Sequence, residues 1–147
     1  MSTTNPTCPE SRWELYSHGA DIGIRGFGNH LAEAFEAIGQ ALTSAICNLN
    51  SVRPIQRIEV RCAAQDHEAL LYEWINAIVY EMAVRRMLFR RYEVIILDGK
   101  LSGSLWGEAL DAQRHEPAVE VKGATYTDLR LEQDANGIWI TQCIIDV

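Results

Sequence analysis

Asp21 is a single carboxylate among small and apolar residues, within the segment His18–Gly28, HGADIGIRGFG. The alternating Ile22 and Ile24 that follow it are typical of a β-strand. Aspartate is unfavourable in strands and is rarely buried without a partner. A carboxylate at this position therefore either caps a turn or binds a cation, and this segment alone leaves both interpretations open.

The other end of the chain carries two more carboxyl groups. The apolar run 143–145 leads into Asp146 and Val147, so we expect a last strand that holds the Asp146 side chain near the terminal carboxylate. If this strand lies beside the strand that follows Asp21, three carboxyl groups meet at one edge. Like charges about 4 Å apart repel by about 4 kcal/mol at an effective dielectric of about 20, and a hard divalent cation would reverse that balance. No compact ligand motif is present, so a turn-capping Asp21 and a merely exposed Asp146 remain the alternative.

Two histidines are weaker candidates. His18 lies three residues before Asp21, where it either takes part in the site or, as we favour, forms a structural hydrogen bond. His115 lies before Glu116 and Pro117 in a long polar connection and is more typical of a turn. The four cysteines are widely spaced, without a Cys-x-x-Cys pair, which argues against zinc or dithiol chemistry.

Length and composition limit the classes of function. The 147 residues suit one domain, with a flexible lead-in over 1–11 and a single domain over 12–147. The net charge of −7 gives no overall attraction to a phosphate backbone, which argues against DNA binding. No apolar run approaches the ~18 residues of a membrane span, and residues 1–9 are polar, so we expect a cytoplasmic protein without membrane contact.

Four arginines form the one local exception to the acidic charge. Arg85 and Arg86 precede an apolar tripeptide, and Arg90 and Arg91 follow it. The first pair suits a helix C-terminus and the second pair suits solvent, whereas together they would suit an acidic protein surface or RNA.

Periodicity predicts the elements that position these groups. Apolar spacing of three and four residues predicts two helices, one from the N-cap Asn29 to about Cys47 and one from the N-cap Asp66 to about Val84. The expected strands cover residues 13–16, 21–27, 55–62, 89–97, 100–106, 119–131 and 138–145, with hairpin turns at 98–99 and 136–137 and a bulge near Gly123. We therefore predict an α+β fold, in which two helices pack on a mostly antiparallel or mixed sheet of about six strands in two layers.

The chain resembles the archease family over about residues 12–147. The similar segments, in chain order, are residues 18–28, 31–37, 70–76, 107–108, 115–117, 120–126 and 145–147. Two positions depart from the family pattern: Gly19 stands where threonine is usual, and Thr127 stands where histidine is common.

The resemblance implies a function and a set of site residues. Archeases are not enzymes; they activate a GTP-dependent RNA ligase that joins a 2′,3′-cyclic phosphate or 3′-phosphate end to a 5′-hydroxyl. Activation promotes ligase guanylylation and multiple turnover in tRNA splicing or RNA repair. GTP is used by the ligase, and RNA is contacted only through the ligase. The implied ligands of a divalent cation (Ca²⁺, Mn²⁺ or Mg²⁺) are Asp21, Asp146 and the terminal Val147, and Lys122, His18 and His115 are further candidates for ligase activation.

Two other classes of function stay open on the residues alone. One is a metal-dependent hydrolase that uses Asp21, Asp146 and a histidine, although no nucleophile–base pair or phosphate-binding loop supports it. The other is a chaperone-like module that binds proteins.

Overall fold

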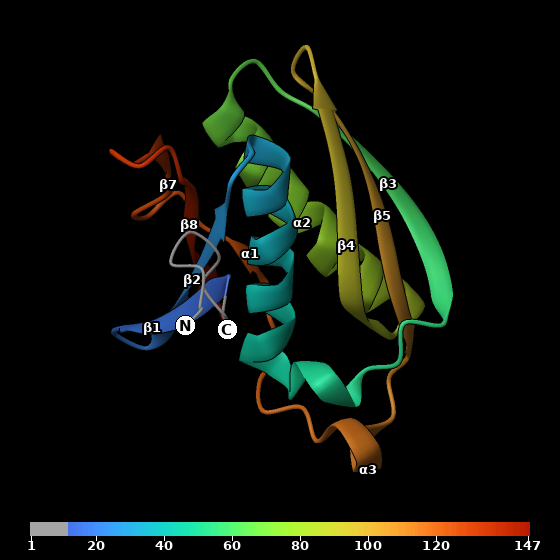
Figure 1. Cartoon of the computed structure of the whole chain (residues 1–147). Coiled ribbons are helices and arrows are strands. Elements are labelled where there is room, and N and C mark those ends of the chain that lie inside the picture. Colours follow the sequence, from blue (N-terminus) through green and yellow to red (C-terminus); the bar gives the residue numbers. More distant parts are fainter. Residues whose placement is uncertain (1–11) are drawn as a thin grey trace, which may run out of the picture.

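The structure, a computed structural model, describes residues 12–147 as two long helices and two antiparallel sheets (Figure 1). The helices are α1 Leu31–Ile46, α2 His67–Arg85 and the short α3 Ala112–His115, with a 3-10 turn at Leu49–Ser51. The strands are β1 Trp13–His18, β2 Asp21–Gly28, β3 Gln56–Ala63, β4 Met87–Leu97, β5 Lys100–Ala109, β6 Gly123–Ala124, β7 Arg130–Gln133 and β8 Trp139–Asp146. The predicted lead-in, residues 1–11, lies outside the described residues. No helix in the described range is long and apolar enough to cross a membrane.

The first sheet joins the first two strands of the described chain to its last strand. Its order is β1-β2-β8, and β6 and β7 pair with successive parts of the other edge of β8. The second sheet has the order β3-β5-β4 and includes the predicted hairpin at Asp98 and Gly99, both of which have positive φ.

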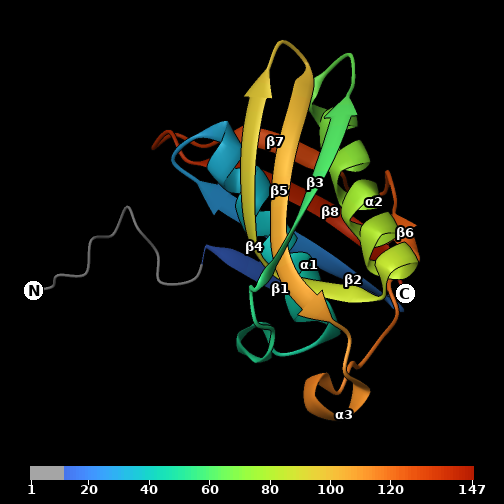
Figure 2. The same ribbon diagram turned by 90° about the vertical axis from the view of Figure 1, so that its right-hand side faces the viewer.

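Both long helices lie between the two sheets (Figures 1 and 2). Helix α1 packs on β2 on one side and on β4 on the other, and α2 contacts β3 as well as β6. The predicted α+β class, with two main helices and mostly antiparallel strands, is confirmed. The strands form two sheets rather than one, and the predicted two layers are wrong because the helices are a middle layer: α1 is apolar on both faces, with Phe35 and Leu42 fully buried between the sheets.

A carboxylate side chain fixes the N-terminal end of each long helix. The predicted cap Asp66 is confirmed, since its carboxylate accepts the Ala69 N–H at 2.8 Å. The predicted cap Asn29 is wrong: α1 begins after His30, and Glu33 reaches back to accept the Asn29 N–H at 2.8 Å.

The predicted strand over 119–131 is also wrong. Val121 packs into the core, and Asp128 adopts a positive φ in a turn closed by the Leu129 N–H and the Tyr126 carbonyl. This turn divides the segment into β6 and β7, and the predicted bulge near Gly123 is absent from the register of β6. A register shift occurs instead in β4, between Phe89 and Arg91.

Glu108 is the centre of a buried polar network at the base of the fold. Its carboxylate accepts hydrogen bonds from Arg114 Nη2 at 2.7 Å and from the Arg53 N–H at 2.8 Å. His115, only 3% exposed, accepts the Asp111 N–H at Nδ1 and donates Nε2–H to Glu108 at 2.9 Å. The network is therefore complete only with neutral His115 and ionised Glu108, and it fastens α3 to the end of β5.

Gly26 permits the close approach of β2 to α1. A methyl group at this position would lie 2.5 Å from the Ile38 backbone nitrogen and 2.7 Å from the Ala34 carbonyl oxygen. We expect Gly26→Ala to lower the free energy of unfolding by about 1–3 kcal/mol in urea denaturation, because the helix backbone must move. The matched control is Gly23→Ala on the same strand, where the nearest atoms to the added methyl belong to the Tyr16 side-chain ring, which can move more easily than a helix backbone. Equal losses for the two variants would contradict this account of the packing.

The Glu108 network also predicts how stability depends on pH. Burial raises the pKa of Glu108, but hydrogen bonds from Arg114, Arg53 and His115 outweigh it and lower the pKa from 4.5 to about 2. The carboxylate therefore stabilises the fold fully above pH 4.5, and this stabilisation is lost as the pH falls towards 2. We expect the free energy of unfolding of Glu108→Gln to fall less steeply over this range than that of the wild type. Urea titrations at each pH, with the exposed Glu132→Gln as control, measure the slopes; parallel slopes for wild type and Glu108→Gln would refute the assignment.

Candidate functional site at the paired ends of β2 and β8

Asp21 and Asp146 lie at the same end of two paired strands. Asp21 begins β2 and Asp146 ends β8, and the strands are antiparallel with Ile22 opposite Ile145. The two aspartates follow at the next register position, so two residues that are far apart in the sequence meet here. Asp21 is partly exposed and Asp146 is exposed, so both carboxylates have access to solvent.

Lys122 approaches the same edge from the other side of β8. Its N–H donates to the Asp146 carbonyl at 2.7 Å, and the next residue, Gly123, lies opposite Asp146 in the β6–β8 pair. The Lys122 side chain is exposed. An exposed basic residue therefore lies next to Asp146 along the paired backbones.

The turn from β1 into β2 brings His18 to the edge and leaves it in solvent. His18 lies opposite Asp21 in the β1–β2 register, and Gly19 between them has a φ of +61°, a conformation that glycine adopts without strain. His115 lies elsewhere: it belongs to the buried Glu108 network of α3, which both views separate from the C-terminus (Figures 1 and 2).

The two aspartates at this edge offer carboxylate oxygens, the type of ligand that a hard divalent cation prefers. Side chains alone do not complete a cation site, because residues 12–147 contain no group of three or more His, Cys, Asp or Glu arranged for a metal ion. The two aspartates therefore suit Ca²⁺, Mg²⁺ or Mn²⁺ in ligand type, and further oxygens must come from the terminal carboxylate of Val147, the backbone or water.

Asn76 was not predicted as part of this region. Its Oδ1 accepts the Ala124 N–H at 2.9 Å, and so fastens β6 to α2. Thr125 adds two bonds to the Ile144 carbonyl, one from its N–H at 3.0 Å and one from its hydroxyl at 2.9 Å. In the sequence, Asn76 stands out as a polar residue within the mostly apolar pattern of α2. That pattern does not predict which group Asn76 binds.

The four arginines do not form one patch. Arg85 pairs with Glu81 one turn earlier on α2, and Arg90 donates to the Val52 carbonyl at 3.4 Å. Arg91 stacks on the Trp106 ring, 4.2 Å from its centroid, on the outer face of the second sheet. The Arg86 side chain is exposed and makes no hydrogen bond or ion pair within the described residues. The prediction that Arg85 complements a helix C-terminus agrees with its place in the last turn of α2.

Comparison with known proteins gives one consistent family. The profile of the Archease protein family (MTH1598/TM1083) matches residues 13–147. "Protein archease" of Pyrococcus abyssi is 41% identical over 140 residues, which cover 92% of this chain and 99% of that protein. "Protein archease" of Sulfurisphaera tokodaii is 34% identical over 138 residues, with the same coverage of 92% and 99%.

Two solved structures share the fold. The solution structure of protein 1598 of Methanobacterium thermoautotrophicum superposes with a TM-score of 0.77, 22% identity and coverage of 93% of this chain and 99% of that one. The crystal structure of an "archease, possible chaperone" from Thermotoga maritima has a TM-score of 0.60, 18% identity and coverage of 91% and 96%. These two likenesses concern the fold alone. Because the family profile and relatives 34–41% identical extend over nearly the whole chain, this protein belongs to the archease family.

Proposed function

We propose that this chain is a non-enzymatic activator of a GTP-dependent RNA ligase, which promotes ligase guanylylation and multiple turnover in tRNA splicing or RNA repair. Membership of the archease family supports the proposal, and the pairing of β2 with β8 is the structural observation that supports it most. Because of that pairing, two acidic residues that are far apart in the sequence lie together at one solvent-facing edge. In this proposal the ligase uses the GTP and holds the RNA, and this protein contacts the RNA only through the ligase.

A divalent cation is part of the proposal. Asp21, Asp146 and the terminal carboxylate of Val147 would hold it, and it would offset the repulsion among these groups. The exposed Lys122 beside Asp146 would then face the ligase together with the cation, as a second positive group at one edge. Strands β2 and β6 pair with the two sides of β8 near its end, and this pairing sets where the backbone of Asp146 lies.

Cation binding tests the edge without the ligase. We expect Asp21→Asn and Asp146→Asn each to weaken the binding of Ca²⁺ or Mn²⁺ by about tenfold or more, because each removes a charged oxygen ligand. Isothermal titration of the purified protein with each ion measures this. Asp98→Asn is the matched control, since Asp98 is an exposed aspartate in a hairpin turn whose positive φ asparagine also adopts. Unchanged affinity in both site variants would remove the cation from the proposal.

Stimulation of the ligase tests the function itself. Purified ligase from the same organism is incubated with GTP, with or without this protein, and guanylylation and ligation over many turnovers are measured. We expect the wild type and Asp98→Asn to restore multiple turnover. Stimulation by Asp146→Asn should be weaker by about tenfold or more, because this variant lacks one negative charge of the edge.

The opposite outcomes are equally clear. No stimulation by the wild-type protein would refute the ligase activator. Hydrolysis of a 2′,3′-cyclic phosphate by this protein alone, lost in Asp146→Asn, would favour the metal-dependent hydrolase instead.

A further inference from the structure

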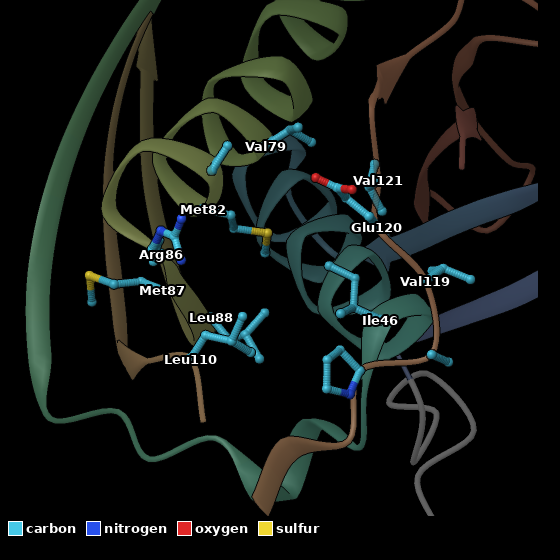
Figure 3. Close-up of a pocket in the computed structure, with 13 residues that line it drawn as sticks. Ile46, Val79, Met82, Arg86, Met87, Leu88, Leu110, Val119, Glu120 and Val121 are labelled. Carbon is cyan, nitrogen blue, oxygen red and sulfur yellow. The ribbon is translucent and has the colours of Figure 1, made fainter. Parts of the chain in front are cut away.

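An apolar hollow of about 580 Å³ opens between the C-terminal half of α2 and the segment 117–121 (Figure 3). Val79 and Met82 line it from α2, Ile46 and Leu88 form its floor, and Leu110 lies at its lower rim. Leu110 is 44% exposed. The hollow is therefore an apolar surface that the described part of the chain leaves uncovered.

Two opposite charges flank the hollow. Arg86 lies on the side of α2, and Glu120 lies on the opposite side (Figure 3). Both side chains are exposed, and neither makes a hydrogen bond or an ion pair within residues 12–147. This differs from Arg85 and Arg91, which pair with Glu81 and Glu93. An occupant with an acidic group opposite Arg86 and a basic group opposite Glu120 would complement both charges.

The backbone beside the hollow also offers unused donors. The segment 117–122 is anchored at Ala118, whose N–H donates to the Ile46 carbonyl at 2.7 Å, and at Lys122, whose N–H donates to the Asp146 carbonyl at 2.7 Å. Between these anchors, no N–H of residues 119–121 donates to a group in the described part of the chain. The N–H groups of residues 119–121 are therefore left for water or for an occupant that lies along this segment.

The hollow and the acidic edge are consecutive along the chain. Val121 lines the hollow, and the next residue, Lys122, donates to Asp146. A protein bound in the hollow would thus be held beside Asp146 and Lys122.

We propose that this hollow is the docking site of the partner ligase, filled by an apolar segment of that protein with an acidic residue opposite Arg86 and a basic residue opposite Glu120. The inference rests on the proposed ligase-activating function and adds a division of labour to it. The hollow provides affinity, and the Asp21–Asp146 edge provides activation. Substitutions in the hollow should therefore change the concentration of this protein that half-saturates stimulation, whereas substitutions at the edge change the stimulation reached at saturation.

The test titrates purified ligase with variants of this protein and measures guanylylation. We expect Leu110→Glu to raise the half-saturating concentration by about tenfold or more, with stimulation at saturation unchanged, because a charge then replaces an apolar contact. Arg86→Glu should act in the same direction through charge reversal. The matched control is Ile95→Glu, which changes a side chain 70% exposed on the second sheet and should behave like the wild type.

Photo-crosslinking makes the result independent of activity and of a folding defect in Leu110→Glu. A photo-reactive amino acid at position 110 should crosslink to the ligase, and one at position 95 should not. The docking site is refuted if Leu110→Glu and Arg86→Glu half-saturate stimulation at the same concentration as the wild type and position 110 does not crosslink. The activator function still stands in that case, provided that the wild type stimulates the ligase. Crosslinking at position 110 without stimulation supports the docking site and refutes the activator. A wild type that neither stimulates nor crosslinks refutes both.

Discussion

The pairing of β2 with β8 is the interaction on which the rest of the structure depends. It runs from Ile22–Ile145 to Gly28–Trp139 and ties the start of the domain to its end. Strands β6 and β7 pair with the other edge of β8, so the β2–β8 pairing connects them to β1 and β2 in one sheet. The same ladder aligns Asp21 with Asp146, so the proposed site is a direct product of the topology rather than of a local motif.

The edge is supported from two helices by different means. Helix α1 approaches β2 through Gly26, where backbone meets backbone with no room for a methyl group. Helix α2 holds β6 by a side chain, the Asn76 carboxamide that accepts the Ala124 N–H. Asp21 is thus set by close packing, and the backbone beside Asp146 is set by hydrogen bonds. The Glu108 network fixes the start of the segment 117–122 in a similar way, because it orders α3 just before that segment begins.

Much of this fold could be predicted from the sequence because local periodicity follows burial. The stripes of α1 and α2, the Asp66 cap and the hairpin at Asp98 depend on neighbours within a few residues. Which strands become neighbours depends on contacts across the whole chain, so one sheet was predicted where two form. Likewise, Val119 and Val121 share a strand-like face because they pack against the core, not because the segment 119–131 pairs throughout. The link between Glu108 and His115 had no signal, since it arises only when α3 folds back.

Helix α1 has a consequence for how motion is distributed in the molecule. Ten of its sixteen residues are buried, and Thr43 donates its hydroxyl to the Phe89 carbonyl of the opposite sheet at 2.6 Å. Since α1 contacts both sheets, we expect the amide hydrogens of its buried middle to exchange with water only through global unfolding. The strand end at Asp146 is bordered on one side by β6, which has only two residues in register with β8, so its opening breaks few backbone hydrogen bonds. We therefore expect slow hydrogen exchange in α1 and faster exchange in β6. A partner that binds at Asp146 can then change the conformation of β6 without unfolding α1.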